Sequence, residues 1–369
     1  MTKALISGYI GFHNSGDEAV LMAIVQDLRA AVRDVDITVL SRRPEETSVS
    51  YGVQAVDRFS PAEVWKAVKD CDVLISGGGS LVQDVTSSRS LFYYLGIIWL
   101  AKRLGRKVMV YANGVGPVRR PVNRLLTSFV LNQVDLITLR DQASAAELER
   151  LGVRRPRILV SADPVFGLRP VAPERADAVL ATEGLAGSGS GVGPLVGISV
   201  RRWDGLERWG PVVAAAADHL VERHGARIVF LPMEFPGDVE VSRWVASRMH
   251  FKGAKVLGGR YLATEYMALV GRLDLLVGMR LHSLIFAARQ YVPLVGLEYD
   301  PKVRGVLTAL GQSVAGDVLS IDTKTLVAAA DAALEGEVGS REALSQRLAA
   351  LERLARDNAT LASELFPQN

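Results

Sequence analysis

The chain has 369 residues, of which 49% are apolar and 22% are charged, and its formal net charge is +3 at pH 7. This composition predicts a soluble, globular protein that is long enough for two domains. The single cysteine, Cys71, excludes a disulfide framework. The small net charge, without a finger motif, an RNA-binding motif or a basic stripe interleaved with aromatic residues, indicates no nucleic-acid partner.

The N-terminus passes from Met1-Thr2-Lys3 straight into a strand pattern, so no signal peptide is predicted. The longest apolar stretch, 91–101, is shorter than the roughly 18 residues that a membrane span needs. We therefore expect a cytoplasmic protein. The stretch 91–106 mixes aromatic with basic residues, which fits a buried helix with a basic end or a peripheral contact with the inner face of the cell membrane.

In the first half of the chain, short apolar runs alternate with longer amphipathic ones. Strands are predicted at Ala4–Ser7, Ile37–Leu40, Val73–Ile75, Val108–Tyr111, Leu136–Leu139 and Ile158–Val160, and helices at Glu18–Ala31, Leu91–Arg103 and Ser144–Leu151. The strand runs are apolar without strict alternation, which is typical of a parallel sheet covered on both faces.

The pattern stops in a stretch rich in Pro, Ala, Gly and Ser and then starts again. Strands are predicted at Val196–Val200, Ile228–Leu231, Leu275–Val277 and Leu294–Gly296, and helices at Val212–Arg223, Val239–Met249, Ala263–Val270, Ser283–Arg289, Val303–Leu310 and within Arg341–Leu365. The predicted organisation is an N-terminal Rossmann-like domain (1–170), a linker (171–193), a C-terminal Rossmann-like domain (194–335) and a C-terminal helical segment (336–369). Two such α/β domains should face a cleft and bind ligands beyond the carboxyl ends of their strands.

The loop after the first strand, Gly8 to Glu18, opens a helix. Ser15 and Glu18 predict a capping box, which explains those two residues. It does not explain Asn14, Asp17 and the glycines, which let a ligand approach the backbone. We expect Asn14 and Asp17 to contact an acceptor sugar, with Asp17 as a weaker candidate for a catalytic base.

Three further loops of the first half follow strands. Ser76-Gly77-Gly78-Gly79-Ser80 is neither a dinucleotide fingerprint nor a Walker A loop, but its exposed backbone N–H groups suit an oxyanion or a sugar. We place Gly78, Gly79, Ser80 and the nearby Gln83 on the acceptor side. Asn113 to Pro117 forms the next loop. Arg140 starts a helix, where a cation opposes the helix dipole and therefore favours a bound anion.

The second half carries the strongest candidate site. Arg280 and His282 flank the start of a helix after a strand, and Lys302 lies just beyond the next strand. Cations that converge in this way need an anionic ligand to offset their repulsion. Arg201 and Arg202 follow another strand, and one of them could point into the cleft. The sequence leaves open which one it is; Arg201, which is nearer the strand end, is counted among the candidates for binding phosphoenolpyruvate. The histidines show no metal-ligand spacing, so no metal is predicted, and His219 and His224 are expected to be solvated.

Seven motifs in chain order make the sequence resemble the polysaccharide pyruvyl transferase family. They are Gly16-Asp17-Glu18-Ala19, Ser76-Gly77-Gly78-Gly79-Ser80 with Gln83-Asp84, Gly114-Val115-Gly116-Pro117, Arg140-Asp141 with Ser144, Asp163-Pro164-Val165-Phe166, Met279-Arg280-Leu281-His282 and Tyr299-Asp300-Pro301-Lys302. The resemblance implies a GT-B-type glycosyltransferase architecture. The branch that it resembles serves cell-surface polysaccharides. Its members pyruvylate N-acetylmannosamine in a lipid-linked precursor of a secondary cell-wall polysaccharide, and S-layer homology domains recognise the resulting ketal.

The resemblance also implies the chemistry. Phosphoenolpyruvate is the co-substrate, no cofactor is needed, and the acceptor is a lipid-linked saccharide. By motif, the residues that bind phosphoenolpyruvate are Arg140, His282 and Lys302, with Arg280 as a neighbour. His282 is the candidate general acid.

Two other hypotheses about the function remain open at this point. A sugar-nucleotide-dependent glycosyltransferase on the same fold would also need a cationic wall for phosphate. A non-catalytic protein that binds a carbohydrate or phosphate would show the same loops without turnover.

Overall fold

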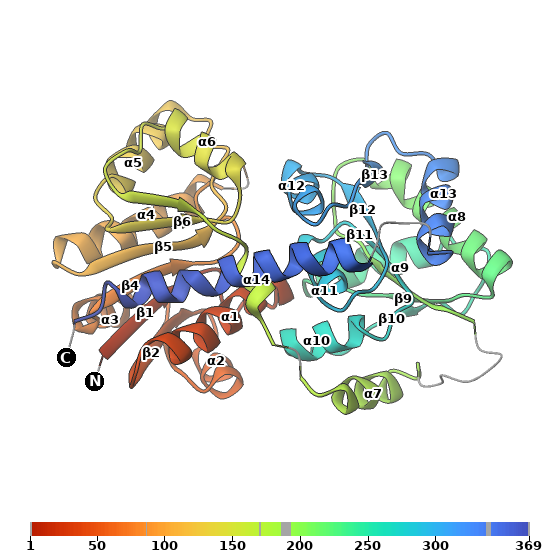
Figure 1. The fold of residues 1–369 in the computed structure, drawn as a ribbon, viewed down its shortest axis with the longest axis horizontal. Coiled ribbons are helices and arrows are strands. Elements are labelled where there is room, and N and C mark those ends of the chain that lie inside the picture. Colours follow the sequence, from red (N-terminus) through yellow and green to blue (C-terminus); the bar gives the residue numbers. More distant parts are fainter. Residues whose placement is uncertain (1, 86, 170, 186–192, 337–340, 368–369) are drawn as a thin grey trace. The chain divides into compact units, whose positions relative to one another are not determined.

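The computed structural model describes residues 2–85, 87–169, 171–185, 193–336 and 341–367. The chain divides into two compact units (Figure 1). The first unit comprises residues 1–12, 17–168 and 350–369, and the second comprises 13–16 and 169–349. The chain thus enters the second unit briefly at His13–Gly16 and ends in the first unit.

The first unit is built on a seven-stranded parallel sheet. Its strands are β1 (Thr2–Ser7), β2 (Val35–Ser41), β3 (Gln54–Asp57), β4 (Val73–Gly77), β5 (Lys107–Asn113), β6 (Leu136–Leu139) and β7 (Arg157–Val160). They lie in the order β3-β2-β1-β4-β5-β6-β7. All residues of β4 and β6 are buried, because helices cover both faces of a parallel sheet.

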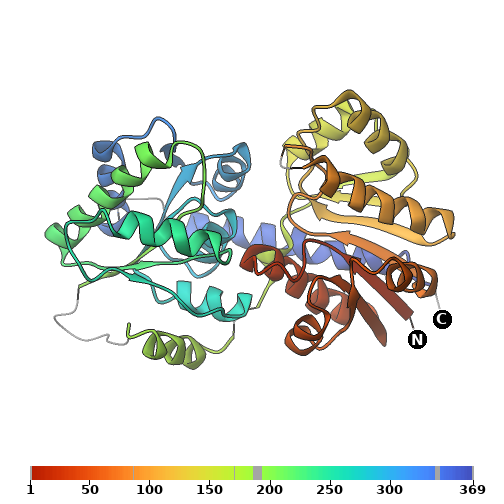
Figure 2. The same ribbon diagram turned by 180° about the vertical axis from the view of Figure 1, so that it is seen from behind.

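Helices follow most of these strands. They are α1 (Ser15–Ala31), α2 (Pro44–Tyr51), α3 (Pro61–Asp70), α4 (Ser88–Arg103), α5 (Pro121–Leu131), α6 (Gln142–Arg150) and the 3-10 helix η1 (Pro164–Gly167). The last helix, α14 (Arg341–Ser363), brings the chain back to this unit. Apolar residues of α3, α4, α5 and α6 share one core cluster with the sheet, so these four helices cover the same face. Figure 2, the view from behind the molecule, shows the helices on this face of the sheet.

The start of α1 corrects the predicted capping box. The backbone N–H of Ser15 donates to the carbonyl of Met233 at 2.7 Å, so it does not bond to Glu18. The carboxylate of Glu18 instead accepts from the Gly11 N–H at 2.9 Å and from the Tyr51 hydroxyl at 2.6 Å. Burial raises the pKa of Glu18 despite these two donors. Glu18 therefore fixes the loop before α1 rather than the first turn of the helix.

The second unit contains a six-stranded parallel sheet. Its strands are β8 (Leu195–Ser199), β9 (Arg227–Phe230), β10 (Lys255–Val256), β11 (Leu275–Gly278), β12 (Leu294–Glu298) and β13 (Val314–Asp317), in the order β10-β9-β8-β11-β12-β13. Its helices are α7 (Pro173–Thr182), α8 (Leu206–His224), α9 (Gly237–Ala246), α10 (Ala263–Val270), α11 (Leu281–Arg289), α12 (Pro301–Ala309) and α13 (Thr323–Leu334). The two helix-covered parallel sheets confirm the predicted class of two Rossmann-like domains.

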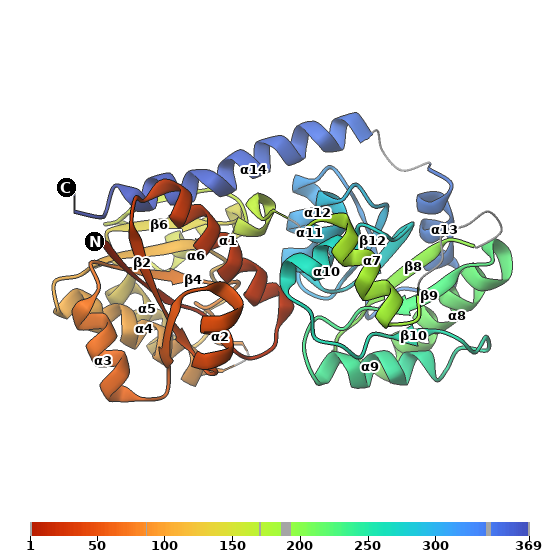
Figure 3. The same ribbon diagram turned by 90° about the horizontal axis from the view of Figure 1, so that it is seen from below.

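The stretch predicted as a linker, 171–193, contains helix α7. Its buried residues Ala176, Val179 and Leu180 follow helical spacing. The helix packs on α10 (Figure 3), and Arg175 pairs with Glu265 of that helix at 2.5 Å. The glycine-serine part of the predicted linker, 186–192, lies outside the described residues. At the other end of the chain, 350–369 belong to the first unit rather than to a separate segment.

No helix of the described residues combines the length and apolar character needed to cross a membrane.

Asp84 joins the two loops that follow β4 and β5. Its carboxylate accepts from the backbone N–H groups of Arg119 and Arg120 at 2.8 and 2.9 Å, and from the Asn123 amide at 2.8 Å. Burial alone would raise the pKa of Asp84, but these donors outweigh it and lower the pKa. The ionised carboxylate therefore holds the start of α5 against the loop after β4.

We predict that Asp84→Ala lowers the free energy of unfolding by about 2 kcal/mol at pH 7, because one buried and two part-buried donors lose their acceptor. Since the folded state depresses the pKa of Asp84, this contribution is present above the unfolded-state pKa of about 3.9 and disappears as the pH falls through the folded-state value. Urea unfolding at several pH values measures it. Asp70→Ala, an exposed carboxylate on α3, is the matched control, and equal effects of both variants would contradict the assignment.

Candidate functional site

Three neighbouring strands of the second unit end beside one another. Strands β8, β11 and β12 are adjacent in the sheet, and all three are parallel. Arg201 follows β8, Arg280 follows β11, and Tyr299 follows β12. The topology therefore gathers these three side chains at the carboxyl edge, where open α/β sheets bind ligands.

Arg201 and Tyr299 are in direct contact. The Arg201 guanidinium donates to the Tyr299 hydroxyl at 3.0 Å, and its central carbon lies 4.8 Å from the centroid of the tyrosine ring. The Trp203 ring packs edge-on against Tyr299, with 4.9 Å between ring centroids. The aromatic rings thus limit the orientations that the Arg201 guanidinium can adopt.

Lys302 adds a second positive charge. It lies in the first turn of α12, which Asp300 caps by accepting from the Lys302 N–H at 3.0 Å. The Lys302 ammonium lies 5.2 Å from the Tyr299 ring centroid and 3.4 Å from an Asp300 oxygen. Burial would raise the pKa of Tyr299, but the charges of Lys302, Arg201 and Arg280 outweigh burial and lower it. The lowered pKa reports a positive local potential.

Arg201 carries a charge that no carboxylate offsets within the part of the chain that the structure describes. The Arg201 guanidinium donates to the Tyr299 hydroxyl, and its Nε is buried without a hydrogen-bond partner among the described residues. Arg202 differs, since it is exposed and pairs with Glu240 at 3.1 Å. A buried donor without a partner costs about 1–3 kcal/mol. Of the two arginines, Arg201 is therefore the one prepared for an anion.

Arg280 is held by protein carboxylates. Its guanidinium donates to both oxygens of Asp238, at 2.8 and 2.6 Å, and to Glu234 at 2.6 Å. The expectation that Arg280 needs an anionic ligand to offset its charge is therefore wrong, because the sequence did not reveal these two partners. Its contact with phosphoenolpyruvate stays a prediction.

The segment His13–Gly16 is fixed to the same ion-pair loop. Phe235 N–H donates to the His13 carbonyl at 3.1 Å, and Asn14 bridges to Glu234. The His282 Nδ1 lies 2.2 Å from where a Cβ on Gly16 would be, so only glycine lets this segment approach His282. The predicted acceptor residue Asn14 lies in this segment, and its side chain accepts from the Gly16 N–H at 3.0 Å.

Arg140 lies in the first unit, after β6. Its side chain is buried and pairs with Asp163 at 3.2 Å, while a second nitrogen donates to the Ser80 hydroxyl at 2.8 Å. A Cβ on Gly114 would come within 2.8 Å of this guanidinium. Asp163 therefore supplies the negative charge that the sequence analysis expected from a bound anion. Asp163 belongs to one of the seven family motifs, but the sequence did not indicate this partner.

The structure brings several predicted acceptor residues together with Arg140. Gly79 N–H donates to Asp17 at 3.4 Å, and a Cβ on Gly79 would lie 3.8 Å from Arg140. Gly78 has φ 148°, a value that favours glycine. Gln83 accepts from the Val85 N–H at 2.7 Å. Asp17, Gly79, Ser80 and Arg140 thus form one group, while their contacts with an acceptor stay predictions.

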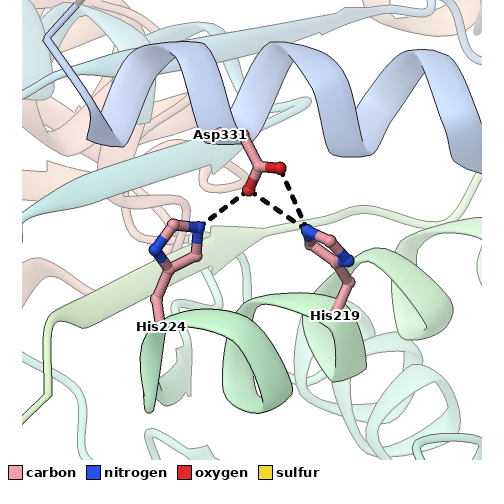
Figure 4. Close-up of side chains that lie close together, drawn as sticks. All are labelled: His219, His224 and Asp331. Atoms are coloured by element: carbon pink, nitrogen blue, oxygen red, sulfur yellow. Dashed lines mark hydrogen bonds and ion pairs between the residues drawn. The ribbon is translucent and has the colours of Figure 1, made fainter.

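His219 and His224 are paired rather than solvated. Both lie on α8 and point toward Asp331 of α13 (Figure 4), at 3.0 and 2.8 Å for their Nε2 atoms. The ligand atoms of the three residues lie within 4.8 Å of one another, so they are a set that could hold a metal ion. Arg223 also donates to Asp331, at 2.8 Å. The Asp331 carboxylate therefore already has hydrogen-bond partners, and the cluster links helix α8 to helix α13.

Comparison with known proteins identifies the family. The family model described as polysaccharide pyruvyl transferase matches residues 14–301. The chain belongs to the polysaccharide pyruvyl transferase family. The chain is 22% identical to the amylovoran biosynthesis protein AmsJ of Erwinia amylovora, over 90% of this chain and 92% of that protein. The family and this relative place the chain among transferases of polysaccharide biosynthesis.

Solved structures of other proteins share the fold of this chain. The chain superposes with a TM-score of 0.66 on S. aureus MnaA with UDP, at 11% identity and over 97% of this chain and 94% of that one. The UDP-GlcNAc 2-epimerase of Neisseria meningitidis, bound to UDP-GlcNAc, gives 0.64 at 10% identity, over 99% of both chains. At this identity the likeness shows the fold alone, which is the GT-B type.

We predict that inorganic phosphate, once it is fully dianionic, binds the wild-type protein less tightly as the pH rises from 8 toward 10. Ionised Tyr299 would pair with Arg201 and Lys302 and would compete with the anion, and its lowered pKa brings this competition to a lower pH. Isothermal titration calorimetry at several pH values measures the affinity.

Tyr299→Phe should flatten this pH dependence while leaving affinity at pH 7 within about threefold of the wild type. Tyr291→Phe, an exposed tyrosine of the same unit, is the matched control. Identical pH profiles for the wild type and Tyr299→Phe would show that Tyr299 does not contribute.

Proposed function

We propose that this chain transfers the pyruvyl group of phosphoenolpyruvate to two hydroxyls of a sugar as a cyclic ketal, with release of phosphate. The acceptor is N-acetylmannosamine in a lipid-linked precursor of a cell-wall polysaccharide, in the branch that serves S-layer anchoring. The reaction takes place at the cytoplasmic leaflet, where such a precursor is accessible. The family match supports pyruvyl transfer, and the sequence motifs support this branch.

The uncompensated charge of Arg201 carries the proposal. Phosphoenolpyruvate bears about three negative charges at neutral pH, one from its carboxylate and the rest from its phosphate. Arg201 and Lys302 offer an arginine fork and a lysine point charge beside one another. Arg280 also belongs to the proposed ligand set, and its carboxylate partners fix its orientation. The sequence motifs assign Arg140 to phosphoenolpyruvate as well, and its pair with Asp163 fixes its orientation within the first unit.

His282 is the proposed general acid. Its proton goes to the methylene carbon of phosphoenolpyruvate, which becomes the methyl group, while an acceptor hydroxyl attacks the adjacent carbon and gives its proton to a base. The bond from that carbon to the phosphate oxygen then breaks, and phosphate leaves with the electron pair. A second hydroxyl attacks, loses its proton and closes the ring. The weaker candidate for the base is Asp17, on the acceptor side with Asn14 and the glycine loop.

The proposal predicts a contrast between two adjacent arginines. Arg201→Ala should lower kcat/KM for phosphoenolpyruvate at least about 100-fold, because a charge-assisted pair worth about 3 kcal/mol is lost. Arg202→Ala, the matched control on the surface, should stay within about twofold. His282→Ala and Lys302→Ala should both abolish acceptor-dependent phosphate release. The measurement is continuous phosphate release with phosphoenolpyruvate and a synthetic N-acetylmannosaminyl acceptor.

Wild-type turnover in both His282→Ala and Lys302→Ala would overturn the assigned roles. The same assay distinguishes pyruvyl transfer from the alternative, a sugar-nucleotide-dependent GT-B glycosyltransferase. Structural neighbours bound to UDP or UDP-sugars are the reason to consider this alternative. That enzyme would release a nucleotide from a sugar nucleotide and no phosphate from phosphoenolpyruvate. A protein that only binds its ligand would give neither product.

A further inference from the structure

Helices α4 and α5 lie side by side on one face of the first unit. They follow the adjacent strands β4 and β5, contact each other, and bury their inner residues in the same core cluster. The two helices therefore form one layer on this face of the sheet, as Figure 2, the view from behind the molecule, shows. Helix α3 lies beside α4 in this layer.

The outer face of α5 is apolar. Val122, Leu125 and Phe129 are 70%, 74% and 61% exposed. Their spacing of three and four residues places all three on one stripe of the helix. A helix of a soluble protein normally turns polar residues outward, so an exposed apolar stripe of this kind marks a surface that contacts something.

The neighbouring helices extend this apolar character. Phe92 and Trp99 lie two turns apart on α4 and are 44% and 41% exposed, and Trp65 of α3 is 47% exposed. These helices carry six of the twelve large apolar side chains that the described residues expose. Exposed apolar side chains are therefore concentrated on these three adjacent helices, since the same unit exposes few such side chains elsewhere.

The charges on α4 and α5 have one sign. Neither helix contains Asp or Glu, whereas α4 carries Arg89, Lys102 and Arg103 and α5 carries Arg124. The exposed Arg119 and Arg120 immediately precede α5, and Asp84 holds their backbone in place. The Arg103 guanidinium lies 5.5 Å from the Trp99 ring centroid. Apolar and aromatic residues beside cations are the composition of helices that lie in a membrane interface.

We infer that the outer face of α4 and α5 docks the protein on an anionic lipid bilayer. Val122, Leu125, Phe129 and the α4 aromatics enter the interface, and the arginines contact phosphate headgroups. A second copy of this chain fits the face less well, because self-association would place arginine against arginine without carboxylates between them. Each basic residue near the surface adds attraction that depends on anionic lipid and falls with salt.

This inference locates the membrane contact that the proposed function includes. The evidence for the docking face does not depend on the proposed function; only the reason why the protein would dock there does. Binding to vesicles requires no turnover, and turnover on a water-soluble acceptor requires no vesicles. The two claims can therefore fail separately.

The test is co-sedimentation with vesicles of phosphatidylglycerol or of phosphatidylcholine. We expect the wild-type chain to bind the anionic vesicles, and 0.5 M salt should weaken this binding. The double variant Leu125→Glu/Phe129→Glu should lower the partition coefficient at least about tenfold, since two apolar anchors become charges. Arg119→Ser/Arg120→Ser should reduce binding to the anionic vesicles and leave binding to phosphatidylcholine unchanged.

Val49→Glu is the matched control, because Val49 is 86% exposed on α2 of the same unit. It should bind vesicles as the wild type does. Unchanged melting temperatures and unchanged phosphate release on a water-soluble acceptor would show that the variants fold. The inference is overturned if the wild type ignores anionic vesicles or if the Leu125/Phe129 variant binds them equally well. A wild-type dimer that this variant disperses would assign the face to a second copy instead.

Discussion

Arg280 donates to both oxygens of Asp238 and to Glu234, and this ion pair holds together the loops at the carboxyl edge of the second sheet. Asp238 also accepts from the backbone N–H groups of Met233 and Glu234. The same loop receives the N-terminal segment His13–Gly16 through its backbone, and that segment lies against His282. A buried arginine bound in this way costs several kcal/mol if one partner is removed. The position of the proposed acid, His282, thus depends on this ion pair, and Arg280 has that structural role in addition to its proposed contact with phosphoenolpyruvate.

The distribution of compensated and uncompensated charge explains how the carboxyl edge of the second sheet can be stable and still bind an anion. Arg280 has carboxylate partners, so it holds its loop in the absence of a ligand, and Arg140 does the same within the first unit. Arg201 has a tyrosine hydroxyl instead, and Lys302 has a longer contact with Asp300. The positive potential is concentrated around Tyr299, whose pKa is lowered even though burial acts in the opposite direction. A trianionic substrate is attracted most strongly to the charges that the protein itself leaves unsatisfied.

The sequence predicted the parts of this account that depend on local pattern. Continuous apolar runs identified most strands, and their alternation with helices identified two Rossmann-like domains. Strands β3, β10 and β13 escaped, because they are short and lack a buried apolar run. Partners distant in the chain escaped as well: Asp163 for Arg140, Asp238 for Arg280 and Asp331 for His219 and His224. Tyr299 stood inside a quoted motif, but its role depends on Arg201, which is 98 residues away and meets it only through the order of the strands.

The central claim is that phosphoenolpyruvate binds at the ends of β8, β11 and β12 through Arg201. A crystal structure of the protein soaked with phosphoenolpyruvate tests it most directly. The account predicts density for the ligand with a phosphate or carboxylate oxygen within hydrogen-bonding distance of the Arg201 guanidinium, and Lys302 on the same ligand. Density for phosphoenolpyruvate elsewhere in the protein, with Arg201 still bound only to Tyr299, would contradict it.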